Sequence, residues 1–230
     1  DLHYPLRRQR QMCIRDRQYA VARNFFGLFP LIVYLIISYD FRIKKNTFNI
    51  RHKLISVTRG LSIVFAQGCF YLSIMNLEYA TAATLVFSTP IFLTALSVPI
   101  LGNVVGYWRW SAVLLGFLGI VIIIRPGSES FSIYALLPLG AAFGYALSSV
   151  LVKLFPKEVH TTNIQLYTQL TTLIAAIIIC GFTLSFSYIS SFYDLFLLAI
   201  IGFTGGTGVI FLIWGYRLVE PSLIAPFEYF

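Results

Sequence analysis

The chain has 230 residues, of which 58% are hydrophobic and 11% are charged. A soluble domain has about 25% charged residues and could not bury this much apolar surface, so the composition indicates a polytopic membrane protein. The formal net charge is +8, but no clustered basic face with interleaved aromatic residues accompanies it, which argues against nucleic-acid binding. The three cysteines have neither a disulfide framework nor metal-ligand spacing.

Residues 1–17 differ from everything that follows. They read DLHYPLRRQRQMCIRDR, a polar and basic segment without periodicity that ends abruptly against an apolar run. The segment resembles the translation of a transposon-based sequencing adapter, one reading frame of which spells Asp1 to Asp16. We therefore expect residues 1–17 to be non-native, and His3, Cys13 and the arginines of this segment are excluded from reasoning about the fold.

Apolar runs, each near the roughly 20 residues that a helix needs to cross a bilayer, recur through the rest of the chain. Polar turns bound them, so the sequence predicts an all-α membrane fold. We expect seven complete spanning helices and the start of an eighth that is cut at Phe230. The seven are Tyr19–Tyr39, Leu54–Asn76, Tyr79–Leu101, Trp108–Ile124, Phe131–Phe155, Asn163–Leu184 and Leu195–Tyr216.

Basic residues concentrate in alternate loops. One side of the predicted membrane holds only Arg23 and Arg125, and the other holds the remaining basic residues after position 17: Arg42, Lys44, Lys45, Arg51, Lys53, Arg59, Arg109, Lys153, Lys157 and Arg217. Cytoplasmic loops carry the excess of Lys and Arg. The loops 41–53 and 156–161 are therefore predicted to be cytoplasmic, and the loop 185–194 is predicted to lie outside. Arg59 is interpreted as a topology or headgroup charge at a cytoplasmic helix start.

Motifs with a known chemistry are few. The GFTGGTG stretch at 202–208 has neither a preceding strand nor the GK[ST] ending of a phosphate-binding loop. We expect it to serve close helix packing, as do Gly140 and Gly144 at GxxxG spacing. No HExxH, GxSxG or paired-carboxylate motif occurs after residue 17. We therefore predict no catalytic residue, no metal site and no cofactor.

Polar side chains inside the apolar runs are the candidates for binding, because they are costly in lipid and usually face a bundle interior or a wet cavity. Glu228 lies in the last run beside Tyr229, and Arg23 is its natural opposite charge; a structural carboxyl and a snorkelling arginine are the alternatives. For the neutral residues the alternative is hydrogen bonding between helices, and for Ser88, next to Pro90, bonding to freed backbone carbonyls. The predicted binding residues are Arg23, Gln67, Tyr71, Ser88, Tyr145, Gln169, Glu228 and Tyr229.

Two stretches carry a family resemblance. RWSAVLLGFLGIVIIIRPG, which ends at Gly127, resembles the end of a five-helix repeat in the EamA type of the drug/metabolite transporter superfamily. LIAPFEYF at 223–230 resembles the ninth helix of a subgroup that includes S-adenosylmethionine and amino-acid carriers. The resemblance extends over roughly residues 18–230. It implies inverted repeats, with a first repeat at 18–127 lacking its first helix and a second at 128–230 truncated in its fourth.

The resemblance also implies a function. It is that of a multi-pass secondary transporter of the bacterial inner membrane, which moves a small polar or zwitterionic metabolite, such as an amino acid or S-adenosylmethionine, by alternating access. The expected partners are the small-molecule substrate and the lipid bilayer, with no nucleic acid, and a homodimer is left open. Two other functions also stay open: a non-transporting membrane scaffold or receptor, and an intramembrane enzyme whose catalytic groups lie in the missing helices.

Overall fold

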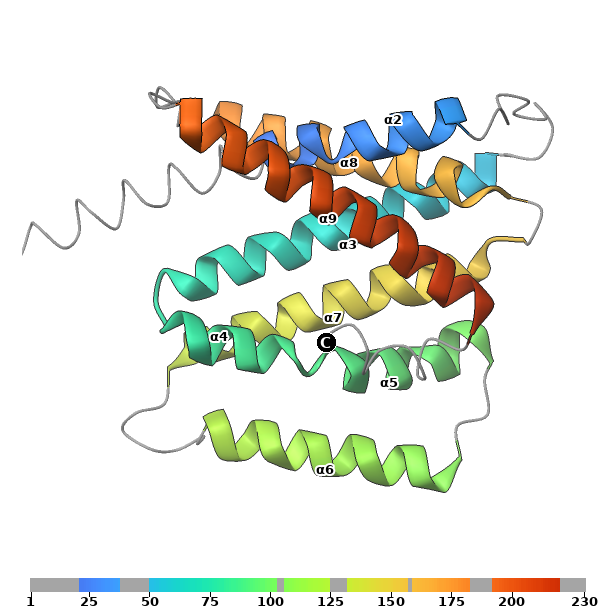
Figure 1. The fold of residues 1–230 in the computed structure, drawn as a ribbon. Coiled ribbons are helices and arrows are strands. Elements are labelled where there is room, and N and C mark those ends of the chain that lie inside the picture. Colours follow the sequence, from blue (N-terminus) through green and yellow to red (C-terminus); the bar gives the residue numbers. More distant parts are fainter. Residues whose placement is uncertain are drawn as a thin grey trace, which may run out of the picture. The chain divides into compact units, whose positions relative to one another are not determined.

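The computed structural model describes residues 21–37, 50–102, 106–124, 132–156, 159–182 and 192–219, and the regular secondary structure in these ranges is helical. Residues 21–26 are helical, and a turn at Gly27 separates them from the next helix. The further elements (Figure 1) are α2 (Leu28–Ile37), α3 (Ile50–Ile74), α4 (Tyr79–Val86), α5 (Thr89–Leu101), α6 (Tyr107–Ile124), η1 (Ile133–Ala135), α7 (Leu136–Leu151), η2 (Val152–Leu154), α8 (Thr161–Phe182) and α9 (Phe192–Leu218).

The helices confirm the prediction of an all-α, multi-pass membrane protein. Within the described part of the chain, five segments are long and apolar enough to cross a membrane: Arg51–Ile74, Tyr79–Leu101, Ile133–Leu154, Thr161–Gly181 and Leu195–Leu218. Val21–Tyr34 and Trp110–Ile124 are shorter apolar helices. The count of seven spans and the inverted repeat stay predictions. Residues 1–17, Glu228 and Tyr229 lie outside the described residues.

The third predicted span is interrupted at Pro90. This proline has no N–H with which to bond the carbonyl of Val86, four residues earlier, and the chain divides into α4 and α5 there. The hydroxyl of Thr89 donates to the oxygen of Val86 at 2.7 Å, and the hydroxyl of Ser88 donates to the oxygen of Leu85 at 2.6 Å. Thr89 therefore satisfies the carbonyl that Pro90 leaves without a donor, and Ser88 bonds to the neighbouring carbonyl of Leu85, which also accepts the Ser88 N–H.

The described helices divide into two compact units. Unit 1 consists of Asp1–Leu61 and Lys157–Trp214, and unit 2 consists of Ser62–Pro156 and Gly215–Phe230. Unit 1 thus contains α2, the first half of α3, α8 and most of α9. Unit 2 contains the second half of α3 and the helices from α4 to α7. Each unit combines residues from both predicted repeats.

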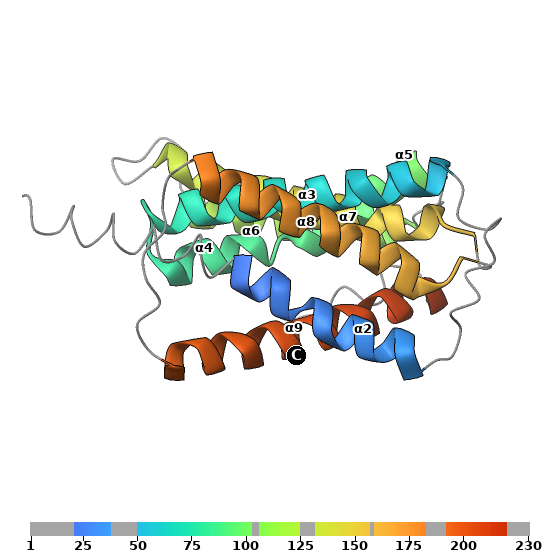
Figure 2. The ribbon, with the colours of Figure 1, turned by 90° about the horizontal axis from the view of Figure 1, so that it is seen from above.

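Glycines bring the helices of unit 1 close together. α2 packs against α8, and Figure 2 shows α2 crossing α9. A Cβ at Gly202 would lie 2.5 Å from the Cβ of Phe26, and one at Gly206 would lie 2.7 Å from the carbonyl oxygen of Gly27. These distances leave no room for a side chain, so Gly202 and Gly206 set the approach of α9 to residues 21–30. The expectation that part of the GFTGGTG stretch serves close packing is confirmed.

Unit 2 has an apolar interior between three helices. α5 packs against both α7 and α6, and Figure 1 shows α5 between them. Leu85, Ile120 and Ala135 are buried together, with Ile91 and Leu139 packed against them. A glycine also allows close packing in this unit. A Cβ at Gly144 of α7 would lie 2.8 Å from the carbonyl oxygen of Ser62 on α3, so no side chain fits between these helices there.

Candidate functional site

Arg59 is a buried charge within a membrane-spanning helix. It is 4% exposed, and it lies nine residues after Ile50, the first residue of α3, which is about 13 Å along the helix axis. The interpretation of Arg59 as a charge at a helix start is therefore wrong. The reason is that Arg59 is buried against α8 and donates hydrogen bonds to its side chains, which a charge facing lipid headgroups would not do. A charge at this depth is costly in lipid and marks a candidate functional position.

The guanidinium of Arg59 reaches two side chains on α8. Its Nη1 donates to Gln165 Oε1 at 3.2 Å and to Thr168 Oγ1 at 3.0 Å. Gln165 and Thr168 are themselves buried, and the hydroxyl of Thr168 donates to the oxygen of Ile164 at 2.8 Å. Gly60 allows this approach, because a Cβ there would lie 2.7 Å from the Cβ of Thr171. The glycine beside Arg59 therefore holds α3 close enough to α8 for the hydrogen bonds to form.

A series of amides continues from Gln165 to the first helical segment. Gln165 Nε2 donates to Gln169 Oε1 at 3.3 Å, and Gln169 Nε2 donates to the backbone oxygen of Asn24 at 2.9 Å. We call the side chains of Arg59, Gln165 and Gln169, together with the Asn24 oxygen, the amide ladder. It joins α3, α8 and residues 21–26 within unit 1.

Asn24, whose backbone oxygen is the last acceptor of the ladder, also carries a side-chain donor that forms no hydrogen bond with the described residues. Asn24 is 5% exposed, and its Nδ2 has no hydrogen-bond partner among the described residues. A buried donor without a partner costs about 1–3 kcal/mol, and such a group in a folded protein calls for an explanation. The amide ladder and this donor form the candidate binding site of unit 1.

The structure brings together two parts of the predicted site in unit 1. Arg23 is half-buried and precedes Asn24, whose backbone oxygen accepts the bond from Gln169. The predicted residue Gln169 therefore contacts the chain next to the predicted residue Arg23. Sequence reasoning missed Asn24 and the role of Arg59. Gln165 lies four residues before Gln169 on α8, and their hydrogen bond shows that the two side chains share one face.

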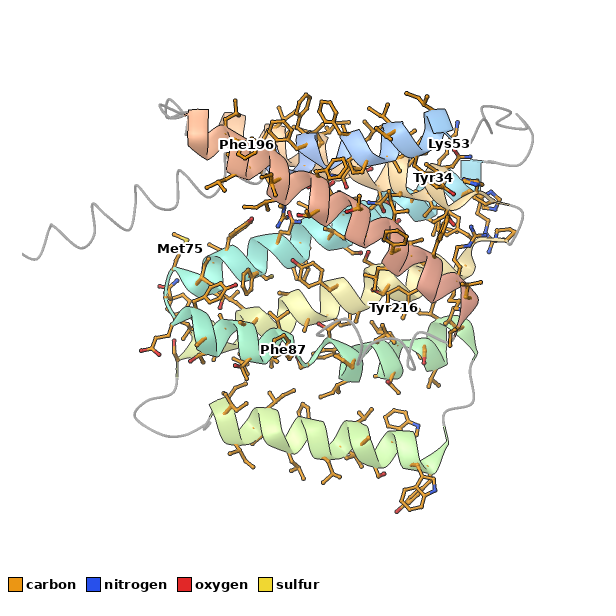
Figure 3. All side chains as sticks on the ribbon, in the orientation of Figure 1. Tyr34, Lys53, Met75, Phe87, Phe196 and Tyr216 are labelled. Atoms are coloured by element: carbon orange, nitrogen blue, oxygen red, sulfur yellow. The ribbon has the colours of Figure 1, made fainter. Side chains whose placement is uncertain are left out.

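The other described candidates lie in unit 2. Gln67 and Tyr71 are half-buried on α3, and Tyr145 is half-buried on α7. Ser88 is buried at the break between α4 and α5, near Phe87 in Figure 3, and its hydroxyl bonds to the backbone of Leu85. That bond accounts for the burial of Ser88 without a substrate.

One end of unit 1 is rich in aromatic and basic side chains. Figure 3 shows Tyr34 and Lys53 at this end and Phe196 at the other. The ring of Tyr34 stacks on His160 with a centroid distance of 6.1 Å, and the amine of Lys53 lies 6.0 Å from the centroid of the Tyr167 ring. These contacts lie at the end of α2, near the start of α3 and at the beginning of α8, so these three helix ends meet at the same end of unit 1.

The described residues offer no group of three or more His, Cys, Asp or Glu side chains that could hold a metal ion. The chemistry of the ladder is that of hydrogen-bond donors and one positive charge. Guanidinium and amide groups of this kind recognise carboxylates and other oxygen acceptors.

Comparisons with known proteins agree with a membrane transporter. Residues 15–125 match the EamA-like transporter family. An S-adenosylmethionine uptake transporter of Rickettsia conorii is 25% identical over 213 residues, which cover 91% of this chain and 69% of the relative. The corresponding transporter of Rickettsia prowazekii matches with the same identity and coverage. No solved structure matches this chain.

A riboflavin transporter of Vibrio cholerae is 44% identical over 69 residues, which cover 30% of this chain and 23% of the relative. The matched relatives are thus transporters of different small molecules, and none of those named here is an enzyme. The family match at residues 15–125, the relatives aligned along most of the chain's length and the apolar helices support an EamA-type membrane transporter of the drug/metabolite transporter superfamily.

Proposed function

We propose that this transporter moves a small zwitterionic metabolite, of the amino-acid or S-adenosylmethionine type, across the bacterial inner membrane by alternating access. The observation that carries the proposal is the buried amide ladder of unit 1, with Arg59 well inside a spanning helix. The alignment of S-adenosylmethionine uptake transporters with 91% of the chain supports the substrate class.

The amide ladder suits the carboxylate of a zwitterion. Its guanidinium carries a positive charge into the span, and amide N–H groups stand beside it on two helical segments. A carboxylate accepts several such bonds, and charge-assisted bonds are shorter and stronger than neutral ones. Arg23, adjacent to Asn24 in the chain, would add a second positive charge at the same segment.

The remaining predicted residues complete the proposal. Glu228, with Tyr229 beside it, would receive the ammonium or sulfonium group of the solute. Gln67, Tyr71, Ser88 and Tyr145 would offer neutral contacts. The loops 41–53 and 156–161 would face the cytoplasm, which is supported by the excess of basic residues there and by the common end of α2, α3 and α8 in unit 1.

Uptake into proteoliposomes tests the proposal. The protein, expressed in its complete reading frame, is reconstituted into vesicles preloaded with unlabelled S-adenosylmethionine, and entry of the labelled compound is followed. We expect labelled S-adenosylmethionine or an amino acid to accumulate in exchange for the internal pool. Arg59→Met should abolish most of this exchange, whereas Arg217→Met should keep it, because Arg217 bonds at the surface to the oxygen of Pro156.

A second substrate class is supported by the riboflavin transporters among the relatives. The Rhizobium johnstonii protein is 29% identical over 150 residues, which cover 64% of this chain. Riboflavin is neutral and has no carboxylate, so its binding does not require the positive charge of a buried guanidinium. Exchange of labelled riboflavin that is unchanged in Arg59→Met, with no exchange of zwitterions, would replace the proposed substrate class.

A further inference from the structure

The amide ladder has one direction, and its two ends fix that direction. A guanidinium only donates hydrogen bonds and a backbone carbonyl only accepts them. Arg59 therefore requires the oxygen of Gln165 to face it, and the Asn24 carbonyl requires the nitrogen of Gln169 to face it. The bond from Gln165 Nε2 to Gln169 Oε1 satisfies both requirements at once. Although amide orientations are normally assigned rather than observed, here the two ends independently require the same assignment.

The consequence of this direction is a donor-rich region at Asn24. The ladder presents Gln169 Nε2 there, and the Nδ2 of Asn24 is buried without a partner among the described residues. One amide nitrogen, Gln169 Nε2, thus bonds to the backbone of the residue that carries the other, Asn24 Nδ2, and the latter has hydrogen-bonding capacity left over. A ligand that completes this arrangement must bring an acceptor.

Glycines keep space around these donors. A Cβ at Gly27 would lie 3.0 Å from Gln169 Nε2 and 3.5 Å from the oxygen of Gly202. The absence of a side chain at Gly27 therefore allows the Gln169 amide to reach the Asn24 backbone while α9 passes close by. The same packing buries Asn24 in this conformation. Under the proposed alternating access, a solute would reach its donor in another conformation, in which unit 1 is open.

We propose that the Nδ2 of Asn24 binds the carboxylate of the transported solute, and that Arg59 is a positioning residue that orients the amides toward it. The proposal rests on the proposed function, because it assigns one contact of the same solute. It places the carboxylate on a neutral asparagine and makes the direction of the ladder, rather than a direct ion pair with Arg59, the source of specificity for the acid.

The experiment compares two probes that differ in the carboxylate. The purified protein in detergent is titrated with S-adenosylmethionine and with its decarboxylated analogue, and the ratio of the two dissociation constants is measured. We expect the wild type to bind the carboxylated probe roughly tenfold to hundredfold more tightly, as for a hydrogen bond to a charged group. Asn24→Leu should bring the ratio near one, and Asn24→Asp should favour the decarboxylated probe.

The matched control is Asn76→Asp. Asn76 is an exposed asparagine of unit 2 whose Nδ2 already donates to the oxygen of Leu72 at 3.0 Å, so this variant makes the same chemical change and should keep the wild-type ratio. Size-exclusion profiles establish which variants fold, and either Asn24 variant suffices. An unchanged ratio in a folded Asn24 variant would overturn the subsite.

The wild type alone also decides between two failures. If it exchanges S-adenosylmethionine in vesicles but binds both probes equally, the Asn24 subsite is wrong and the proposed function stands. If it neither exchanges nor binds any zwitterion, the proposed function fails and the subsite fails with it. A role for Arg59 in positioning predicts that Arg59→Met lowers the ratio as well as the affinity, whereas a structural role predicts an unchanged ratio among the folded molecules.

Discussion

Unit 1 and unit 2 both bury polar side chains inside apolar helices, and both contain hydroxyls that bond to their own helix, but unit 1 also has a connected series of bonds between helical segments. In unit 1, Arg59, Gln165 and Gln169 form hydrogen bonds that connect different helical segments. In unit 2, Thr94 and Ser97 donate to the carbonyls of Pro90 and Thr94 on their own helix. Bonds of the first kind depend on how the helices pack, and bonds of the second kind are local.

Polar side chains thus have two structural roles in this membrane protein. A hydroxyl that bonds to a carbonyl of its own helix has its hydrogen-bonding capacity satisfied locally, and the helix surface remains free to pack. A side chain that bonds to another helix fixes the position of both and keeps polar groups in the interior of the bundle. We therefore expect the solute to be bound by polar groups of unit 1, whereas the described helices of unit 2 pack around apolar and small residues.

Removal of Arg59 should have the largest effect on stability. Arg59→Met leaves Gln165 Oε1 and Thr168 Oγ1 without their donor, which should lower the free energy of unfolding by on the order of 3 kcal/mol. Reversible unfolding in mixed detergent micelles measures this value. Thr94→Val in unit 2 removes a hydroxyl that bonds only to its own helix and should cost about 1 kcal/mol. Equal losses in the two variants would erase the distinction between the units.

A smaller effect is expected from a methyl group at Gly202. Its Cβ would meet the Cβ of Phe26 and the oxygen of Arg23 at 3.0 Å or less, and overpacking of this kind costs about 1–3 kcal/mol. Gly205, on the same helix, has nothing within 4 Å of its Cβ position. Gly205→Ala should be neutral or stabilising by up to about 1 kcal/mol. The thermal midpoints of the two variants give the comparison, and a loss at Gly205 as large as at Gly202 would contradict close packing as the cause.

The smallest expected effect is the most diagnostic. Gln165 and Gln169 share one hydrogen bond. The stability costs of Gln165→Leu and Gln169→Leu should therefore deviate from additivity by at least about 0.5 kcal/mol in a double-mutant cycle. In unit 2 the hydroxyls of Thr84 and Ser97 bond separately to the carbonyls of Ala80 and Thr94. The costs of Thr84→Val and Ser97→Ala should therefore add to within about 0.5 kcal/mol. Additive costs for the glutamines would show that the ladder is not a connected network.

The fold was largely predictable because hydropathy and helix breakers are local properties. The apolar runs gave the helices to within a few residues of their ends, and Pro90 marked the break that separates α4 from α5. Gln165 and Gln169 could be paired from their spacing of four residues, which places them on one helix face. The glycine spacings likewise indicated close helix packing.

The centre of the candidate site was not predictable in the same way. Arg59 bonds to residues that are 106 and 109 positions away in the chain, and no local pattern reveals such partners. Its burial was also missed, because a basic residue near a basic loop is typical of an exposed cytoplasmic helix end. Asn24 gave no signal because a neutral amide beside an arginine resembles an ordinary helix end. An arginine in the middle of an apolar run was the clue that deserved more weight.

The glycines between α9 and residues 21–30 also limit how this protein can diverge. A side chain at Gly202 or Gly206 would collide with backbone atoms of the opposing segment as well as with side-chain carbons, and no substitution on that segment removes its backbone atoms. A change at Gly202 or Gly206 would therefore require the helices to move apart, whereas a change at Gly27 would displace the Gln169 amide. In related sequences we expect the three positions to stay small together or to be replaced together, with the amide ladder lost in the second case.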